Sequence, residues 1–279
     1  MTPNEKKNAI RIETVKTGSF TMDYFRFGRG KEILVILPGL SIQSVMGLAD
    51  AVADAYRQLV NDFTIYVFDR RNELPAFYSI GDMANDTAEA LRIAGLKNIN
   101  VFGVSQGGMI AMEIAIAHPE LVKKLILCST VARVTQPFYK TIEKWVYLAR
   151  ERKTTDLFLT FGESIYPQRV FESAKTILLD AAKTVTETDL DRFIILAKSM
   201  RNFDVTQTLE KISCPVLVTG DSEDRLIGAE SVDQIAKIMN RNVGVESYLY
   251  HGYGHAVYDL APDYKERILH FLVQNDSHC

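Results

Sequence analysis

Short continuous apolar runs alternate with helical patterns along most of this chain, and that order limits the possible fold more than any other feature. The runs lie at residues 32–37 (EILVIL), 63–68 (FTIYVF), 98–104, 125–128, 215–219 and 245–250. A strand that is apolar throughout is buried on both faces, as in a parallel sheet. Helical patterns at residues 46–59, 83–94, 108–117, 229–239 and 264–273 can cover those faces. The sequence therefore predicts an α/β fold with a mostly parallel sheet flanked by helices.

Two segments depart from this alternation. Residues 9–17 and 20–27 alternate roughly in polarity around Gly18, which predicts an antiparallel hairpin. Residues 132–204 contain no buried-strand run; helical patterns occur there at 138–153, 155–163, 168–183 and 190–199. We expect an α/β core formed by residues 1–131 and 205–279, and a helical cap or lid formed by residues 132–204.

Charge and cysteine content exclude several classes of protein. The 32 Lys and Arg residues against 35 Asp and Glu residues give a net charge of −3, without the basic footprint of a nucleic-acid binder. Cys128, Cys214 and Cys279 lack the spacing of a disulfide framework or a zinc site. The N-terminal residues are charged and lack the apolar segment of a secretory signal. We expect a cytoplasmic protein that neither binds nucleic acid nor inserts into membranes; the sequence leaves the oligomeric state open.

A candidate nucleophile follows the third of the parallel runs. The segment Gly103-Val104-Ser105-Gln106-Gly107 has the form G-x-S-x-G and leads directly into a helical pattern. A nucleophile on such a tight turn needs neighbours without side chains, so that strand and helix can approach. Ser105 is therefore predicted to attack substrate from the crevice beyond the strand ends.

A serine hydroxyl becomes nucleophilic when a base removes its proton, and histidine is the usual base. Among the five histidines, His251 and His255 flank the loop HGYGH after the last strand. His255 is the preferred candidate, because Gly252 and Gly254 allow this loop to fold over the crevice. His251 is the second choice.

The acid that orients the histidine is expected in the loop after the preceding strand, which carries Asp221, Glu223 and Asp224. Asp224 is preferred because it lies farther along the turn, Asp221 is the second choice, and Glu223 is expected in solvent. The order Ser, Asp, His along the chain differs from the orders found in the two main serine-protease classes.

Two backbone N–H groups must stabilise the oxyanion of a tetrahedral intermediate. Gln106, directly after the nucleophile, is expected to supply one. The loop after the first buried strand, Pro38-Gly39-Leu40, is expected to supply the other. Pro38 has no N–H and Gly39 is expected to shape the turn, so Leu40 is the predicted donor.

With these residues in place, the chain resembles the α/β-hydrolase superfamily from about residue 20 onward. The matching stretches are EILVILPGL, FTIYVFDRR, NINVFGVSQGGMIAMEIAIAHPELVKKLILCST, ISCPVLVTGDSEDRLIG and HGYGHAVYD. Within the superfamily it is similar to capped carboxylesterases, lactonases and haloperoxidase-like enzymes. The resemblance implies the α/β-hydrolase fold, a catalytic triad at Ser105, Asp224 and His255, and oxyanion donors at Leu40 and Gln106.

The chain departs from many relatives at two positions. Pro38-Gly39 stands where they carry His-Gly, and residues 72–75 (NELP) replace a Gly-x-Gly segment. Serine at position 105 disfavours dehalogenases and epoxide hydrolases, which place aspartate there.

The predicted function is hydrolysis of a carboxylic ester or lactone through an acyl-enzyme on Ser105, with no metal, nucleotide or flavin. Aromatic residues of the predicted cap, among them Trp145, Phe161 and Tyr166, are candidates for an apolar substrate pocket, or else pack helix against helix. Proline iminopeptidase-like activity and C–C bond hydrolysis are alternative reactions. A non-catalytic ligand receptor is the alternative of another class.

Overall fold

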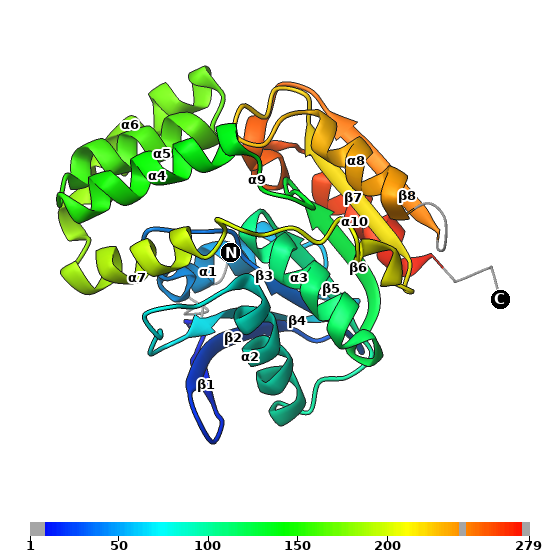
Figure 1. Ribbon diagram of the computed structural model, residues 1–279. Helices are drawn as coiled ribbons and strands as arrows, with labels where there is room; N and C mark the ends of the chain where they lie inside the picture. Colours follow the sequence, from blue (N-terminus) through cyan, green and yellow to red (C-terminus); the bar gives the residue numbers. More distant parts are fainter. Residues whose placement is uncertain (1–8, 240–243, 275–279) are drawn as a thin grey trace, which may run out of the picture.

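The computed structural model describes residues 9–239 and 244–274, which form an eight-stranded sheet and helices on both of its faces (Figure 1). The strand order is β1-β2-β4-β3-β5-β6-β7-β8. Strands β3 to β8 pair in parallel, whereas β1 and β2 form an antiparallel hairpin whose second strand pairs with β4. The strands are β1 Ile12–Lys16, β2 Thr21–Gly28, β3 Glu32–Leu37, β4 Phe63–Arg71, β5 Ile99–Val104, β6 Val122–Cys128, β7 Val216–Asp221 and β8 Val245–Tyr250. The predicted α/β class, with a mostly parallel sheet, is confirmed.

Helices cover the sheet in two groups, and each group buries its own apolar cluster. One face carries α2 (Ile80–Ile93), α3 (Gln106–Ala117) and α8 (Glu230–Met239). The other carries α1 (Ala49–Ala55), α9 (Val257–Leu260) and α10 (Tyr264–Val273). The central strand β5 is buried along its whole length, as a strand covered on both faces must be.

Four α-helices follow β6, before β7, and lie together beyond one end of the sheet (Figure 1). They are α4 Gln136–Arg150, α5 Thr154–Ile165, α6 Gln168–Thr184 and α7 Glu187–Lys198. The two ends of this segment are tied together, because Val134 N–H donates to Phe203 O (3.0 Å) and Val205 N–H donates to Ala132 O (2.9 Å). We call residues 132–204 the helical insertion; its role as a cap over the core remains a prediction.

Element boundaries differ from the sequence prediction at several places. The helix expected at 46–59 is a 3₁₀ turn (Val45–Leu48) followed by α1, which ends at Ala55. The chain then turns so that Leu59 is fully buried. Helix α2 begins three residues earlier than predicted, because Ser79 and Asp82 form a capping box at its start.

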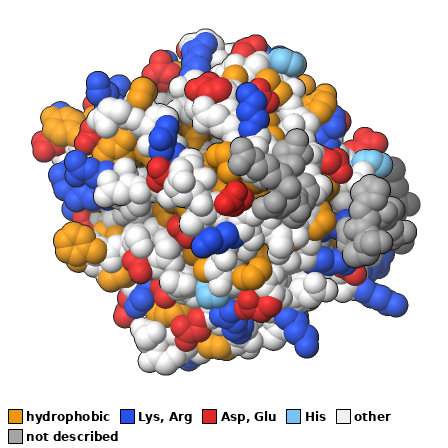
Figure 2. All heavy atoms as spheres, turned by 45° about the vertical axis from the view of Figure 1, so that its right-hand side comes forward, with side chains coloured by type: hydrophobic (Ala, Val, Ile, Leu, Met, Phe, Trp, Pro, Cys, Tyr) orange, Lys and Arg blue, Asp and Glu red, His pale blue; other side chains and the backbone are white. Residues whose placement is uncertain are grey.

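The surface shows no large region of a single charge on the face drawn in Figure 2, where acidic and basic side chains are interspersed. No helix among the described residues is long and apolar enough to cross a membrane. Cys128 is buried at the end of β6, and Cys279 lies outside the described residues.

Candidate active site

Ser105 occupies a sharp turn between β5 and α3. Its backbone has φ 52° and ψ −119°, a conformation that residues with a side chain rarely adopt. A Cβ added to Gly107 would lie 2.0 Å from Leu37 O, and one added to Gly103 would lie 2.6 Å from Gly107 O. Only glycine fits at these two positions, so the G-x-S-x-G pattern is a steric requirement of this turn.

Asp224, His255 and Ser105 form a continuous hydrogen-bonded chain. Asp224 Oδ2 lies 2.8 Å from His255 Nδ1, and His255 Nε2 lies 2.9 Å from Ser105 Oγ. The other oxygen of Asp224 accepts the N–H groups of Leu226 (3.0 Å) and Ile227 (3.2 Å). Asp224 and His255 are each 4% exposed, so both are held inside the protein. The structure thus brings together the three side chains that the sequence singled out from three separate loops.

The second-choice acid has other partners. Asp221 Oδ1 accepts the N–H of Glu223 (2.8 Å), and Asp221 Oδ2 accepts the N–H of Tyr253 (3.0 Å). Asp221 therefore ties the loop after β7 to the loop that carries His255. Glu223 is exposed.

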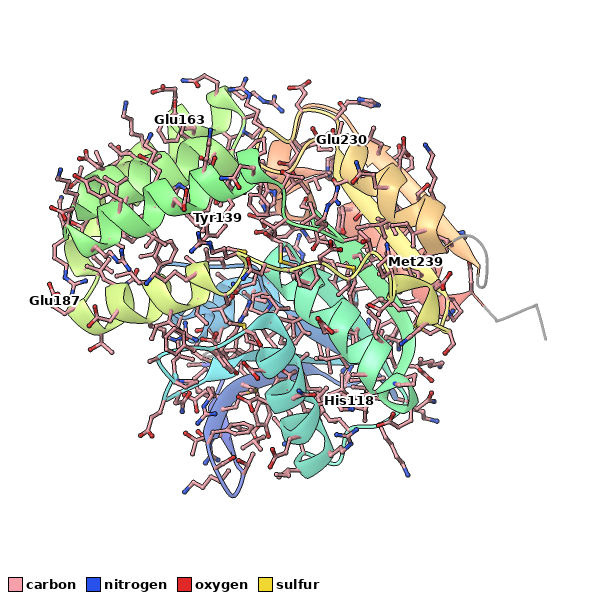
Figure 3. All side chains as sticks on the ribbon, in the orientation of Figure 1. His118, Tyr139, Glu163, Glu187, Glu230 and Met239 are labelled. Atoms are coloured by element: carbon pink, nitrogen blue, oxygen red, sulfur yellow. The ribbon has the colours of Figure 1, made fainter. Side chains whose placement is uncertain are left out.

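The other described histidines lie outside this chain of hydrogen bonds. His251 is exposed and contacts Ser222 Oγ at 2.7 Å. His118 lies at the far end of α3 from Ser105, where it contacts Arg92 and Asn85 (Figure 3).

The two predicted oxyanion donors flank Ser105. Gln106 is the first residue of α3, and N–H groups of a first helical turn have no acceptor within the helix. Leu40 lines the same cavity as Ser105, and no described residue accepts a hydrogen bond from its N–H. The N–H of Gln106 therefore lies directly after Ser105 at the positive end of α3, and Leu40 adds a second N–H in a residue that lines the same cavity.

A buried arginine that the sequence analysis gave no role connects these two segments. Arg70 Nη2 donates to Pro38 O (2.8 Å) and to Gln106 Oε1 (2.8 Å). Gln106 Nε2 donates in turn to Leu196 O (2.7 Å) and Ser199 Oγ (3.2 Å) of the helical insertion. Burial lowers the pKa of Arg70 to about 10, yet the group stays charged at neutral pH.

Asp69 forms a second link between core and insertion. Its Oδ1 accepts from Arg192 Nη2 on α7 (2.7 Å), and its Oδ2 accepts from the Ser44 hydroxyl (2.5 Å). Burial by itself would raise the pKa of Asp69, but the charges of Arg192 and Arg70 outweigh it and the pKa lies below the ordinary value. The one sequence signal for this network was a pair of charges, Asp69-Arg70, at the end of a buried strand.

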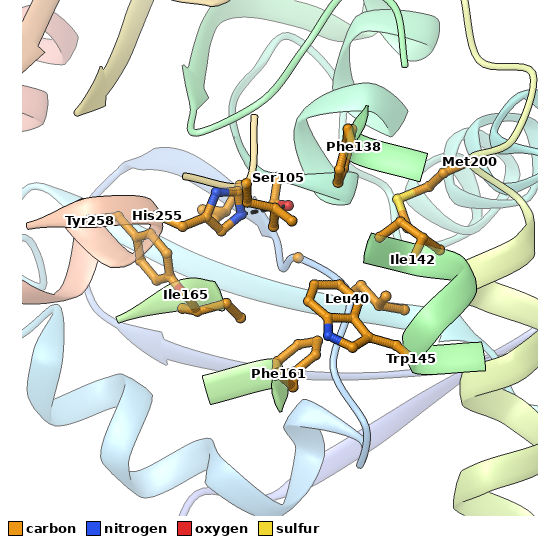
Figure 4. Close-up of a pocket in the computed structure, with 13 residues that line it drawn as sticks. Leu40, Ser105, Phe138, Ile142, Trp145, Phe161, Ile165, Met200, His255 and Tyr258 are labelled. Atoms are coloured by element: carbon orange, nitrogen blue, oxygen red, sulfur yellow. Dashed lines mark hydrogen bonds between the residues drawn. The ribbon is translucent and has the colours of Figure 1, made fainter. Parts of the chain in front are cut away.

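A small cavity of about 30 Å³, which we call the serine chamber, lies between the core and the helical insertion (Figure 4). The core contributes Leu40, Ser105 and His255. The insertion contributes mainly apolar side chains: Phe138, Ile142, Trp145, Phe161, Ile165 and Met200. Two of the three predicted pocket residues, Trp145 and Phe161, line this chamber.

Tyr166, the third predicted pocket residue, lines two neighbouring cavities instead. One, of about 350 Å³, includes His255 and Arg225. The other, of about 330 Å³, lies against α1 and is lined largely by apolar residues; we call it the α1 cavity. The α1 cavity and the serine chamber share Gly39, Leu40, Val104 and Tyr258.

Comparison with known proteins agrees with this architecture. Residues 32–152 match the family model described as the alpha/beta hydrolase fold. Among solved structures, the alpha/beta hydrolase MGS-M2 from a Medee basin deep-sea metagenome library is similar, with a TM-score of 0.85 and 20% identity, covering 96% of this chain and 99% of that one. The enol-lactonase from Burkholderia xenovorans LB400 gives a TM-score of 0.80 and 18% identity, over 94% and 100% of the two chains.

Curated sequences of similar length also match. A protein of Caulobacter vibrioides named "Putative carbamate hydrolase RutD" is 22% identical over 251 residues, covering 87% of this chain and 91% of its own. Its counterpart of the same name in Agrobacterium fabrum is 26% identical over 232 residues, covering 78% of this chain and 86% of its own. The resemblance to the α/β-hydrolase superfamily inferred from the sequence is confirmed.

Proposed function

We propose that this chain, which has the α/β-hydrolase fold, is a serine hydrolase that cleaves a carboxylic ester or lactone through an acyl-enzyme on Ser105. The observation that carries the proposal is the hydrogen-bonded chain from Asp224 through His255 to the hydroxyl of Ser105. A purely structural role for these residues would not require a serine at a strained turn to be hydrogen-bonded to a histidine that is itself hydrogen-bonded to a buried aspartate.

The reaction follows from these positions. His255 Nε2 accepts the Ser105 proton while Oγ attacks the carbonyl carbon, and the N–H groups of Leu40 and Gln106 stabilise the resulting oxyanion. The intermediate expels the alcohol, which takes the proton from His255, and leaves an ester on Ser105. A water molecule then gives its proton to His255 and attacks that ester, which releases the carboxylic acid and restores the serine hydroxyl.

Asp224 keeps the proton of His255 on Nδ1, so that Nε2 is free to accept. It also stabilises the imidazolium that forms during both proton transfers. Its second oxygen is held by the backbone of residues 226 and 227, which fixes the carboxylate in the orientation that the histidine needs.

The cavities support a substrate with two unequal parts. The serine chamber has about 30 Å³, whereas the adjoining α1 cavity has about 330 Å³. Apolar side chains dominate both linings, which favours uncharged groups. We therefore assign the acyl part to the serine chamber and the larger alcohol part to the α1 cavity.

A carbamate is the second candidate substrate, because relatives spanning most of this chain carry the carbamate hydrolase name. Attack of Ser105 on a carbamate uses the same base and the same oxyanion donors, and it differs only in a nitrogen beside the carbonyl.

Labelling with a fluorophosphonate tests the proposal, because the adduct mimics the tetrahedral intermediate. We expect stoichiometric labelling, with the added mass on the peptide that contains Ser105. Labelling should be lost in Ser105→Ala and slowed in His255→Ala. A folded wild-type protein that forms no adduct, while a control esterase reacts, would contradict the proposal and favour a binding function. A panel of esters, lactones and carbamates then ranks the substrate classes.

A further inference from the structure

Trp145 presents a hydrogen-bond donor without an acceptor in the wall of the serine chamber. Its side chain is 1% exposed, and its Nε1–H has no partner among the described residues. A buried N–H without an acceptor is destabilising, so native proteins seldom retain one without a reason.

Neighbouring aromatic side chains fix the position of this donor. The Trp145 ring lies 4.7 Å from the Phe161 ring, centroid to centroid, at 50°, and Phe161 packs edge-on against Phe193 at 6.1 Å. Figure 4 shows the indole nitrogen on the ring edge turned toward Phe161 and Ile165, which also line the chamber. Tightly packed rings hold the donor in this orientation.

We propose that the Trp145 indole N–H binds a hydrogen-bond acceptor in the acyl part of the substrate, beyond the carbonyl that Ser105 attacks. This inference rests on the proposed function and narrows it. The preferred substrate carries an ether, keto or amide oxygen in an otherwise apolar acyl group. A purely alkyl acyl group would fill the same space and leave the donor without a partner.

The preference for an oxygen-containing acyl group follows from whether the Trp145 N–H finds an acceptor. A site with a buried donor discriminates against an analogue that lacks the acceptor, because that analogue leaves the donor unpaired. The remaining chamber residues from the insertion, such as Phe138 and Ile142, offer only apolar contact and do not distinguish an oxygen from a methylene.

Trp145 is the single tryptophan of the chain, so its indole proton gives one resolved signal in a ¹H–¹⁵N spectrum. The test uses Ser105→Ala protein, which binds esters without turning them over, and three ethyl esters of matched shape: pentanoate, ethoxyacetate and 3-methoxypropanoate. The last two replace one methylene of the acyl chain with oxygen. We expect at least one of them to move the indole proton downfield, and pentanoate to leave it nearly unchanged.

The same acids as p-nitrophenyl esters test the kinetic consequence. We compare kcat/KM for each oxygen-containing ester with that for the pentanoate, in wild type and in Trp145→Phe, which removes the N–H but keeps an aromatic ring. The ratio should fall about threefold to tenfold in Trp145→Phe, as expected for one neutral hydrogen bond. Dividing the ratio in Trp145→Phe by the ratio in wild type cancels the intrinsic reactivity of each ester. It also cancels any loss of folded protein.

Phe138→Leu is the matched control, because it alters the same chamber without removing a donor. Its ratio should equal that of wild type. An indole signal that responds equally to all three ethyl esters, or not at all, would overturn the inference, as would an unchanged ratio in Trp145→Phe. The Phe161 ring would then be the partner of the N–H.

Failure of this inference and failure of the proposed function give different results. If Ser105 is not a nucleophile, fluorophosphonate labelling fails, but the indole signal still reports binding. If only the inference is wrong, labelling and turnover persist while the oxygen preference is absent.

Discussion

At the scale of single residues, the site depends on a strained serine and on two aspartates with separate tasks. A residue with a side chain at positive φ costs of order 1–3 kcal/mol, which the surrounding turn must offset. Asp224 contacts the histidine, whereas Asp221 is bonded to two backbone N–H groups. The carboxylate nearest to the strand end thus holds the loop, and the more distant one faces His255.

Asparagine substitutions should separate these two tasks. We expect Asp224→Asn to lower kcat roughly ten-thousand-fold, the size seen for the corresponding change in a protease, because the wrong imidazole tautomer is favoured. Asp221→Asn should reduce the free energy of unfolding by about 1–2 kcal/mol, through a weakened loop bond, and leave most of kcat. Ester turnover and thermal melting measure both effects. If Asp221→Asn lost most of its kcat while Asp224→Asn kept it, Asp221 would be the residue that orients His255.

Arg70 is a second residue to substitute, because one nitrogen of its side chain contacts both Pro38 and Gln106, in the two segments predicted to supply the oxyanion donors. In Arg70→Met we expect kcat to fall on the order of tenfold to a hundredfold, less than the loss of an oxyanion donor itself, with little change in KM. Arg70→Lys should recover part of the loss. Arg57→Met, at an exposed position, is the control; equal effects of both methionine variants would remove Arg70 from a positioning role.

At the scale of elements, polar contacts join helix α7 of the insertion to the core next to the segments predicted to supply the oxyanion donors. The ion pair between Arg192 and Asp69 is mostly buried, with side-chain exposures of 15% and 7%. Breaking one partner of such a pair commonly destabilises a protein by about 3–5 kcal/mol, since the remaining charge is buried alone.

The lowered pKa of Asp69 predicts how this contribution varies with pH. A carboxylate whose pKa is lower in the folded state stabilises fully above its unfolded pKa of about 3.9, and the contribution is lost as pH falls through the folded pKa. The difference in unfolding free energy between wild type and Asp69→Asn should therefore be constant near neutral pH and shrink below about pH 4. Denaturant unfolding at several pH values measures it, and a difference that grows toward acid would refute the role of the carboxylate.

At the scale of the whole molecule, the core and the helical insertion each supply one wall of the serine chamber. The α1 cavity, in contrast, lies mainly within the core, and Tyr166 is its contribution from the insertion. The two halves of a substrate would therefore be selected by different parts of the chain.

Filling the α1 cavity should alter selectivity for the alcohol part of the substrate and leave selectivity for the acyl part unchanged. Val52 lines that cavity and lies outside the serine chamber. In Val52→Phe we expect the ratio of kcat/KM between naphthyl acetate and methyl acetate to fall about fivefold, because pocket methylenes are worth about 1–3 kcal/mol. Ile177→Phe, on the exposed face of α6, should leave the ratio unchanged. If Val52→Phe instead changed the selectivity for acyl-chain length, the α1 cavity would hold the acyl part and the serine chamber the alcohol part.

The elements and the strand-to-helix turn at Ser105 could be predicted from the sequence because their causes are local. Continuous apolar runs dictate buried strands, and two glycines beside a serine permit the turn whatever the rest of the chain does. Helix ends were less accurate: α1 ends at Ala55 because burying Leu59 requires the chain to turn, and that requirement comes from packing.

Apart from Ser105, Asp224 and His255, which the sequence already pointed to, only the tertiary structure decided which distant side chains meet. Arg192 and Asp69 are 123 residues apart, and Gln106 reaches a carbonyl 90 residues away, because the helical insertion folds back onto the core. The same docking places Trp145 and Phe161 in the serine chamber and Tyr166 in the neighbouring cavities. Periodicity specifies which face of a helix is apolar, but the partner of that face depends on the free energy of packing the entire chain.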